Sequence, residues 1–521
     1  MLKAIKNFFI DGIEELNEVI IKPFSKLSFY KKSFLIILAG LLLYIPYLTG
    51  FNATHDEKYT LLMCRFDILK MIKIIAIEDG HPPLSYLYAK FWIWLFGADI
   101  HHIIALRVAT LFTFFLTALI GVFPLKRLLG EKAALCWIIL IFILPSSFYL
   151  AINMRMYPLA VFAIGGEFTY AMLFVYKPKK YDLLRFVAFT LFALYTHYYC
   201  VILSAVIWLT VFIDFINLKE YKKILKLIGA GIFVSLIYTP WLFAYTLQYQ
   251  NMKNLWFIKK QYSSWAIEGA LFAYTNFLEI YHKICLLLGV FCWILSFEFL
   301  LDTKKDNFEH IIAKRALLTF WSIYIIAFIL SIVMRPTLLA AYMIVPVSLF
   351  YIVIALSVMH FKKFRPLFYI FTFAAFIIGY TETYAKVQDK EYIRLQSYIR
   401  EDLPPNSIVL YRYSLDHLLM MFSGPNIDIY YTPAHKHIIL FQDAVQKESK
   451  HLQNIDKYDH FYTLTSMYDP LEYSRCTAQF TTAYDQISYC FTEIPQQEAL
   501  RIIKRTTPTL QGSFHKRSLR L

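Results

Sequence analysis

Two adjacent carboxylates, Asp56 and Glu57, lie in the stretch FNATHDEKYT, directly after an apolar run that ends near residue 50. A carboxylate can take the proton of an attacking hydroxyl group, and a neighbouring carboxylate in a partly dry site raises its proton affinity. The same stretch also fits a structural role, because Thr54 or Asp56 could cap a helix that begins there. The pair is therefore a candidate for general-base chemistry, with helix capping as the alternative.

Other chemically capable side chains occur in four further turns between apolar runs. They are His81 in EDGHPPLSY, Arg155 and Tyr157 in AINMRMYPLA, His197 in LYTHYYC, and Arg335 and Tyr342 in VMRPTLLAAYM. Each has a simpler reading when taken alone, because interfacial arginines extend their charge toward water and a histidine can be a packed, hydrogen-bonded side chain. Their common position at one membrane face, argued below, favours a shared site.

The elements that must position these turns are membrane helices. Of the 521 residues, 58% are apolar and only 17% are charged, which is typical of a polytopic membrane protein. Apolar runs of membrane-spanning character occur near residues 34–50, 103–123, 134–152, 157–176, 183–196, 198–216, 226–246, 283–301, 316–334, 338–358 and 366–381. The sequence predicts about eleven transmembrane helices.

Charge placement predicts the orientation of these helices. The formal net charge is +15, and the tail after residue 381 carries 16 basic and 16 acidic residues, so the surplus lies before it. Alternate loops such as YKPKKYDLLR and LKEYKKILK are basic, which places them in the cytoplasm by the positive-inside rule. We therefore expect a cytoplasmic N-terminus and an external tail, and no partnership with nucleic acid. Residues 1–30 have no apolar core of a cleavable signal peptide.

The chain divides into three predicted regions. Residues 1–32 form a cytoplasmic amphipathic N-terminus, 33–381 form the transmembrane domain, and 382–521 form a small extracytoplasmic α/β domain. Within the second region, residues 51–102 form an external loop with two membrane-surface helices, LLMCRFDILKMIKIIAI at 61–77 and PLSYLYAKFWIWLFG at 83–97. In the third, four short β-like runs (SIVLYRY, IDIYYT, HFYTLTS and YCFTEI) alternate with helical pieces at residues 391–403, 414–423 and 443–453. Cys476 and Cys490 form either a disulfide or two buried thiols.

Four motifs in order resemble a known family. The Asp-Glu pair outside the first span, an HPPL turn between juxtamembrane helices, ALRVAT at the start of the next span and RMYPLA two spans later resemble the bacterial branch of glycosyltransferase family 39. This branch is similar to protein O-mannosyltransferases and to the aminoarabinose transferase that modifies lipid A. The resemblance covers about residues 30–350 and implies the C-type glycosyltransferase fold, a polyprenyl-phosphate sugar donor and a place in the bacterial cytoplasmic (inner) membrane.

The resemblance also implies roles for individual residues. Asp56 matches the catalytic aspartate and Glu57 the second acid of the motif. His81 stands where relatives place a basic residue near the donor phosphate, and Arg155 and Arg335 match external arginines near the same group.

The chemistry of such a transfer fits these residue types. A phosphate leaving group needs cations, for which the bidentate Arg fork is suited, and His81 or Lys58 could add charge. Attack by an acceptor hydroxyl on the anomeric carbon in one displacement inverts that centre, with Asp56 as base. Tyr157, His197 and Tyr342 are expected to line the site. The sequence identifies no certain cofactor, and Asp56, His81 and His197 are candidate ligands for a divalent metal ion.

Several points stay open at the level of sequence. The acceptor could be lipid A of lipopolysaccharide, another glycan or a protein, with membrane lipid as a further partner. A transporter or flippase of a lipid-linked saccharide is the main alternative function, and it predicts polar residues at the bilayer midplane, where Glu167 is the chief example. A sensor or assembly factor is a weaker alternative, because about eleven spans are excessive for an anchor.

Overall fold

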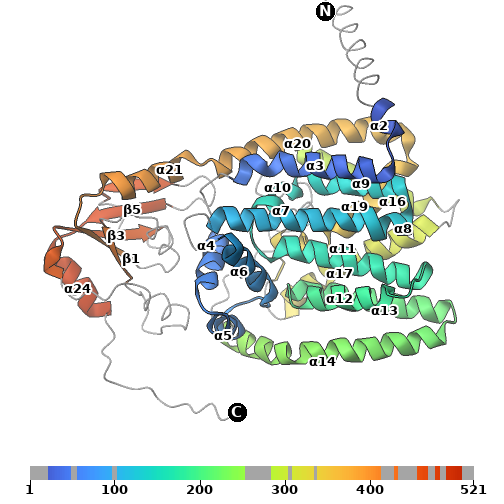
Figure 1. Ribbon diagram of the computed structural model, residues 1–521, viewed down its shortest axis with the longest axis horizontal. Helices are drawn as coiled ribbons and strands as arrows, with labels where there is room; N and C mark the ends of the chain where they lie inside the picture. Colours follow the sequence, from blue (N-terminus) through green and yellow to red (C-terminus); the bar gives the residue numbers. More distant parts are fainter. Residues whose placement is uncertain are drawn as a thin grey trace, which may run out of the picture. The chain divides into compact units, whose positions relative to one another are not determined.

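The computed structural model describes most of the chain, and the helices dominate it (Figure 1). The described residues are 22–48, 55–96, 102–252, 283–302, 308–333, 337–338, 340–411, 427–431, 455–466, 476–481 and 488–506. The chain forms two compact units, of which unit 1 comprises residues 1–49, 79–97 and 104–384, and unit 2 comprises residues 50–78, 98–103 and 385–521.

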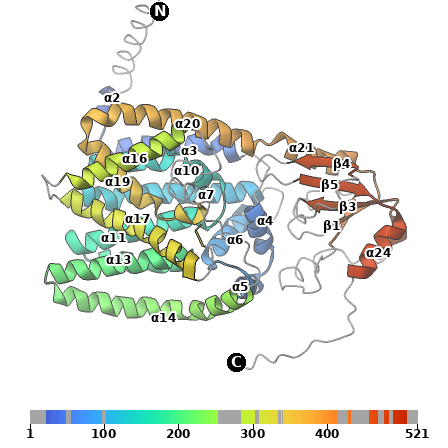
Figure 2. The same ribbon diagram turned by 180° about the vertical axis from the view of Figure 1, so that it is seen from behind.

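Unit 1 is a helical bundle, seen from opposite sides in Figures 1 and 2. Its described elements are α2 (Lys22–Lys26), α3 (Phe29–Leu48), α6 (Leu84–Phe96), most of α7 (His102–Ile120), η2 (Gly121–Leu125), α8 (Lys126–Leu129), α9 (Glu131–Ile143), α10 (Ser146–Ile152), α11 (Met156–Tyr176), α12 (Asp182–Leu194), α13 (Tyr198–Asn217), α14 (Tyr221–Met252), α16 (Lys283–Leu301), α17 (Phe308–Val333), α18 (Ala340–Met343), α19 (Val347–His360), η3 (Lys362–Phe364) and most of α20 (Arg365–Val387).

Eight helices in the described part of the chain are long and apolar enough to cross a membrane. They confirm an all-helical polytopic membrane protein, although the predicted number of about eleven spans is not confirmed. Three further predicted spans correspond to shorter helices, α9, α12 and α19, of 13, 13 and 14 residues.

Two of the predicted spans are interrupted rather than continuous. The run 134–152 breaks between α9 and α10, where Leu144 is extended ahead of Pro145. The run 338–358 breaks between α18 and α19 at Pro346. A proline disfavours helical backbone at the residue before it, and it lacks the amide hydrogen that would continue a helix.

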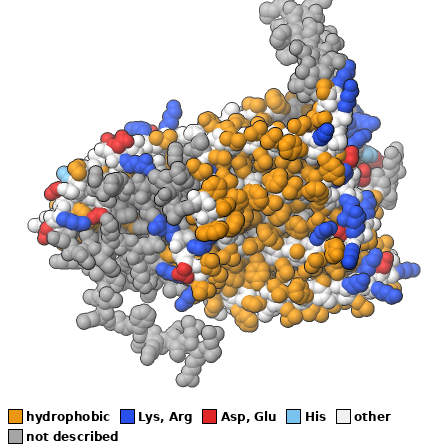
Figure 3. Space-filling view, viewed as in Figure 1, with side chains coloured by type: hydrophobic (Ala, Val, Ile, Leu, Met, Phe, Trp, Pro, Cys, Tyr) orange, Lys and Arg blue, Asp and Glu red, His pale blue; other side chains and the backbone are white. Residues whose placement is uncertain are grey.

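Basic side chains gather at one end of unit 1, around α2 and α8, beside a broad apolar surface (Figure 3). This basic end contains the connections from α8 to α9, α11 to α12 and α13 to α14. Arg127 pairs there with the buried Asp182, and Arg315 pairs with Asp214. The cytoplasmic placement of this end remains a prediction.

Helices α11 and α12 pack tightly against each other near the middle of α11. A Cβ at Gly166 of α11 would collide with the ring of Phe189 in α12, so only glycine allows this close approach. The neighbouring Glu167 is fully buried and accepts hydrogen bonds from Thr190 (2.8 Å) and Ser204 (2.7 Å). Its oxygens are satisfied within the bundle, so Glu167 does not itself indicate a transport path.

The predicted pair of surface helices in the loop 51–102 proves to be three helices. α4 (His55–Arg65) and α5 (Ile68–Glu78) belong to unit 2, and α6 belongs to unit 1. The predicted helix over residues 61–77 ends at Arg65 because the carboxylate of Asp67 accepts a hydrogen bond from the backbone N–H of Lys70 (2.8 Å). Asp67 thus caps the start of α5 and separates it from α4.

Unit 2 also contains the predicted α/β fold of the tail. It has α21 (Lys390–Ser397), η4 (Tyr398–Asp402), η5 (Ile455–Lys457), α24 (Gln496–Thr506) and five strands, β1 (Ser407–Tyr411), β2 (Ile427–Tyr431), β3 (His460–Ser466), β4 (Ala478–Thr481) and β5 (Ser488–Glu493). The strand order is β2-β1-β3-β5-β4, with β1 parallel to β2 and β3 and the β3-β5-β4 pairs antiparallel. Two predicted helical pieces, 414–423 and 443–453, lie outside the described residues.

The core of this sheet domain forms where α24 packs on β1 and β3. Ile408, Leu410 and Phe461 are buried there against Ala499 of α24. Cys476 and Cys490 form a disulfide with a Cα–Cα distance of 5.4 Å, which settles the alternative of two thiols. The bridge joins the residues before β4 to β5, an arrangement that restricts the unfolded chain.

Candidate functional site

The turn between α12 and α13 organises the end of unit 1 that lies opposite the basic loops. The backbone N–H of Leu84 donates to the carbonyl of Tyr195 (3.1 Å), which joins the start of α6 to this turn. The hydroxyl of Tyr195 donates to the carbonyl of Ile237 in α14 (2.7 Å). Three segments that are far apart in sequence are therefore held together here by hydrogen bonds.

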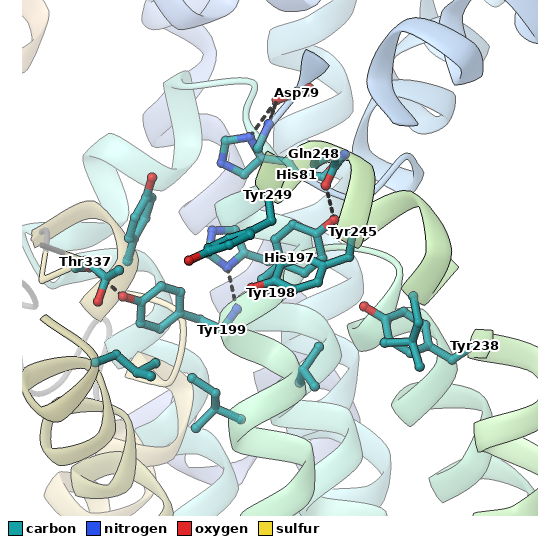
Figure 4. Close-up of a pocket in the computed structure, with 16 residues that line it drawn as sticks. Asp79, His81, His197, Tyr198, Tyr199, Tyr238, Tyr245, Gln248, Tyr249 and Thr337 are labelled. Carbon is teal, nitrogen blue, oxygen red and sulfur yellow. Dashed lines mark hydrogen bonds and ion pairs between the residues drawn. The ribbon is translucent and has the colours of Figure 1, made fainter. Parts of the chain in front are cut away.

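A pocket of about 340 Å³ lies between these segments (Figure 4). Its lining residues are Asp79, Gly80, His81, His197, Tyr198, Tyr199, Val201, Ile202, Tyr238, Leu242, Tyr245, Gln248, Tyr249, Leu330, Thr337 and Tyr342. The volume falls within the range of small-molecule sites, which are usually aromatic-rich with a few placed polar groups. Three sequence-predicted residues, His81, His197 and Tyr342, meet in this pocket.

Asp79 and His81 form a hydrogen-bonded pair on one side of the pocket. Asp79 Oδ1 lies 3.1 Å from His81 Nδ1 and accepts the backbone N–H of Gly80 at 2.5 Å. Burial raises the pKa of the Asp79 carboxyl, but His81, Arg155 and the Tyr86 hydroxyl outweigh this effect and hold the pKa below its usual value. An ionised Asp79 can only accept, so Nδ1 of His81 donates to it and Nε2 is left to contact a ligand.

His197 occupies the N-cap position of α13. Its Nδ1 accepts the backbone N–H of Tyr199 at 3.1 Å, and only 3% of the residue is exposed. Burial is the main cause that lowers the pKa of His197 well below 6.5, and the neighbouring His81 and Arg155 side chains act in the same direction. The ring is therefore neutral, with its hydrogen on Nε2. His197 is therefore a packed, hydrogen-bonded histidine that also lines the pocket, and its role in a functional site remains a prediction.

Arg155 and Tyr157 lie at the start of α11, close to the pocket. Arg155 is 7% exposed, and its Nη1 lies 3.3 Å from the hydroxyl of Tyr86, to which it donates. This burial does not fit an arginine that extends into the membrane interface. The Tyr157 ring lies 5.8 Å from that of His197 and 6.4 Å from that of Tyr342, centroid to centroid. Tyr157 therefore lies beside His197 and Tyr342, and Arg155 is close enough to His197 to influence its pKa.

The sequence alone did not assign several other lining residues. The hydroxyl of Tyr198 donates to Gln248 Oε1, and Gln248 Nε2 donates to the carbonyl of His81 (3.3 Å). The hydroxyl of Tyr199 donates to the Thr337 carbonyl (2.5 Å). Tyr198 and Tyr199 stand beside His197 in sequence, so an aromatic-rich turn was an available signal. Gln248 offers no local signal, because its contact spans 167 positions.

The acidic pair and Lys58 belong to unit 2. α4 begins at His55, so Asp56 and Glu57 lie within its first turn, where the helix dipole favours carboxylates. Asp56 is half-buried and Glu57 is 2% exposed. Lys58 Nζ donates to the hydroxyl of Tyr489 in β5 (2.8 Å), which ties α4 to the sheet of the same unit. Their roles in catalysis remain predictions.

Two predictions have no counterpart in the described structure. Arg335 lies outside the described residues, so its predicted role near the donor phosphate stays a prediction. Across the described ranges, His, Cys, Asp and Glu nowhere gather in a group of three that could hold a metal ion. In addition, Nδ1 of both His81 and His197 is already engaged in a protein contact.

The pocket combines hydrogen-bonding groups with aromatic ring faces. The neutral His197 offers an Nε2 donor, the pair Asp79–His81 offers the second ring nitrogen of His81, and tyrosine hydroxyls surround both (Figure 4). Tyrosine pairs an apolar ring with a polar tip. Such a lining suits a compact polar molecule that has both hydroxyl groups and apolar faces, as a sugar ring does.

The neutral state of His197 predicts a pH dependence of stability. Because its pKa is lowered in the folded protein, the unfolded chain binds a proton below pH 6.5 that the folded chain does not, and stability falls as the pH drops. His197→Asn replaces the capping Nδ1 by an amide oxygen, which can also accept the backbone N–H, and the asparagine does not titrate. We expect wild type to lose stability relative to the variant as the pH falls below 6.5, by up to about 1.4 kcal/mol of unfolding free energy per pH unit. Thermal unfolding in detergent at several pH values measures this difference, and a pH-independent difference would contradict a neutral His197.

Comparison with solved structures identifies the fold. The chain is similar to ArnT from Cupriavidus metallidurans bound to undecaprenyl phosphate, with a TM-score of 0.54 and 11% identity, over 88% of this chain and 97% of that chain. ArnT in the apo state gives a TM-score of 0.55 and 10% identity over the same shares. An oligosaccharyltransferase of Archaeoglobus fulgidus in complex with Zn and sulfate gives a TM-score of only 0.41 and 12% identity, over 82% of this chain and 67% of that chain.

No family model matches the sequence, and no curated protein matches it. The structural likeness to ArnT, together with the eight long apolar helices, defines an integral membrane protein. Its fold is the C-type glycosyltransferase fold that the sequence resemblance implied.

Proposed function

We propose that this protein is a membrane glycosyltransferase that moves a sugar from a polyprenyl-phosphate donor to an acceptor outside the cytoplasm. The observation that carries the proposal is the pocket that unit 1 builds from the turn at Asp79–His81, the start of α13, the last turns of α14, and Leu330, Thr337 and Tyr342, in a chain with the fold of ArnT. ArnT itself has been solved with undecaprenyl phosphate bound. The pocket lies at the end of the bundle opposite the basic loops, which is the external end if those loops are cytoplasmic.

The pocket is proposed to hold the sugar of the donor. Tyrosine rings and hydroxyls, with Nε2 of both histidines, match a polyhydroxylated ring. The phosphate of the donor needs positive charge, which we assign to Arg155 beside the pocket and to Arg335, with His81 in support. Lys58 is a weaker candidate, because its ammonium group already contacts the Tyr489 hydroxyl.

The proposed reaction is a single inverting displacement. The acceptor oxygen forms a bond to the anomeric carbon as the bond from that carbon to the phosphate oxygen breaks, and polyprenyl phosphate leaves with the electron pair. Asp56 takes the proton of the acceptor hydroxyl and later releases it to water. Glu57 is proposed to tune the proton affinity of Asp56. These two assignments rest on the sequence resemblance and on the chemistry of the transfer.

Asp79 is proposed to position His81 for this reaction. Asp79→Asn removes a charge-assisted hydrogen bond, so we expect kcat/KM to fall by about 10- to 100-fold. The same substitution in a His81→Ala background should have little further effect, because the two residues act through one another. Full additivity of the two losses would contradict a positioning role, and melting temperatures of each variant show whether folding is affected.

The function can be tested in cells without knowing the donor or the acceptor. Deleting the gene should raise the level of one polyprenyl-phosphate-linked sugar and remove the same sugar from one glycoconjugate, both measured by mass spectrometry. Restoring the wild-type gene should reverse both changes. Unchanged lipid-linked sugars together with unchanged glycoconjugates would contradict the proposal. A transporter is indicated instead if the purified protein moves the lipid-linked sugar across vesicles without releasing polyprenyl phosphate.

A further inference from the structure

A second hollow lies on unit 1 at its basic end, apart from the pocket described above. It is a groove of about 960 Å³ between α3, α9, α19 and α20. Its lining residues are Leu43, Lys132, Leu135, Cys136, Ile139, Leu140, Ile143, Val358, Met359, Lys362, Arg365, Phe368, Tyr369, Thr372, Phe373 and Phe376. The proposed transfer reaction uses none of them.

The walls and the mouth of the groove differ in chemistry. The walls are aliphatic and aromatic, and Ile139, Tyr369 and Phe373 on them are exposed on the apolar surface of the bundle. The mouth carries three cations, Lys132, Lys362 and Arg365. An apolar trough that ends in a cationic mouth has the charge distribution that complements an anionic lipid.

Two of the cations at the mouth belong to the first turn of a helix, although the guanidinium group of Arg365 itself reaches the last carbonyls of α19. Lys132 is the second residue of α9 and Arg365 is the first residue of α20, so both lie at positive helix ends. The neighbouring carboxylate, Glu131, instead lies 3.1 Å from Lys126. Two helix N-termini and three cations therefore converge on one opening, a combination that binds anions.

Arg365 is held in place at this mouth. Its Nε donates to the carbonyl of Val358 (2.9 Å) and its Nη2 to that of Met359 (2.5 Å), at the end of α19. Within the described residues, Nη1 makes no hydrogen bond to protein. The guanidinium group is thus fixed by two backbone contacts, with one nitrogen available to a phosphate oxygen.

A buried hydroxyl in the wall provides an independent sign of a ligand. Thr372 lines the groove, is 2% exposed, and its Oγ1 has no hydrogen-bond partner among the described residues. Thr110 and Thr117, two other buried threonines of the bundle, donate to the carbonyl four residues earlier, whereas Thr383 in α20 has no partner among the described residues either but does not line the groove. Thr372 lies seven residues after Arg365, about 10 Å along the helix. A polar acceptor inside the groove would satisfy it.

We propose that this groove binds one anionic phospholipid. Its phosphate lies between Lys132, Lys362 and Arg365, an ester carbonyl accepts the hydrogen of the Thr372 hydroxyl, and its acyl chains cover the aromatic wall. The site is separate from the pocket proposed for the sugar donor, so its occupancy can be measured without any transfer assay.

Native mass spectrometry of the full-length protein tests the headgroup preference. The protein, in a mild detergent, is titrated with dioleoylphosphatidylglycerol or with zwitterionic dioleoylphosphatidylcholine. We expect one phosphatidylglycerol to bind at least about tenfold more tightly, and Lys132→Ala with Lys362→Ala to abolish the difference. Lys222→Ala with Lys226→Ala, which removes two exposed lysines of α14 at the same end, should preserve it. Equal binding of both lipids to wild type, or equal losses in both double variants, would overturn the proposal.

Cys136 reports whether the lipid lies in the groove itself. It lines the groove and is half-buried, whereas the other free cysteines of the chain are buried. Phosphatidylglycerol should slow its alkylation by N-ethylmaleimide severalfold, and phosphatidylcholine at equal concentration should not. Thr372→Val should weaken phosphatidylglycerol binding severalfold with an unchanged melting temperature. Binding that leaves Cys136 alkylation unaltered would place the lipid elsewhere and overturn the assignment.

Discussion

Replacing Asp56 with Asn is expected to lower the rate of sugar transfer by about 10²- to 10⁴-fold, the contribution typical of a general base. Asn is nearly isosteric but cannot accept the acceptor's proton. Asp56 is half-buried in the first turn of α4, so the change should alter folding little. Mass spectrometry of membranes from cells that carry only the variant should find the same missing sugar as the gene deletion.

Two matched variants make this result specific. Asp402→Asn makes the same chemical change at an exposed position of unit 2 and should leave transfer at the wild-type level. Glu57→Gln separates chemistry from folding, because Glu57 is 2% exposed. A loss of activity at an unchanged melting temperature assigns Glu57 to the chemistry, whereas a lower melting temperature assigns it to the fold. If Asp56→Asn is expressed normally and every glycan is unchanged, Asp56 is not the base.

The second large effect is expected at Arg155. Arg155→Met removes the cation proposed to stabilise the leaving phosphate, and we expect kcat/KM to fall by about 10²- to 10³-fold. Arg155→Lys keeps the charge but loses the bidentate fork, so its loss should be intermediate. A transfer assay with a lipid-linked sugar measures both variants.

The control for Arg155 is Arg127 at the other end of the same bundle. Arg127 pairs with the buried Asp182, so Arg127→Lys should lower thermal stability without changing the KM for the donor. If Arg155→Lys and Arg127→Lys behave alike, with reduced stability and an unaltered KM, then Arg155 has a structural role rather than a role in donor binding.

Local signals in the sequence predict much of the fold. Apolar runs mark the long helices, and the four predicted strands correspond to β1, β2, β3 and β5. Pro145 and Pro346 are visible in the sequence, but the apolar runs around them predict continuous spans. β4, with only four residues, carries too little pattern to be recognised. Asp67 falls within the predicted helix over residues 61–77, whereas its carboxylate caps α5.

The site could be predicted only in part. Histidine and tyrosine in otherwise apolar turns are unusual enough to be noticed, and His81, His197 and Tyr342 do meet in one pocket. Gln248 could not be predicted, because nothing near it in sequence indicates that a long helix would bring it to the carbonyl of His81. Asp79 lies in the same EDGHPPLSY turn as His81, but its position in the sequence does not assign it to the site. Its role depends on the contact with His81 and on burial, which arise from the folded structure.

The most direct test of the proposed function follows the sugar during a reaction with purified protein. Wild-type protein in lipid vesicles would be incubated with the polyprenyl-phosphate-linked sugars and with the membrane glycoconjugates of cells that lack the gene. We expect one lipid-linked sugar to disappear, an equal amount of free polyprenyl phosphate to form, and one acceptor to gain the mass of that sugar. A folded protein that leaves all lipid-linked sugars intact, while its gene restores the missing glycan in cells, would contradict a transferase.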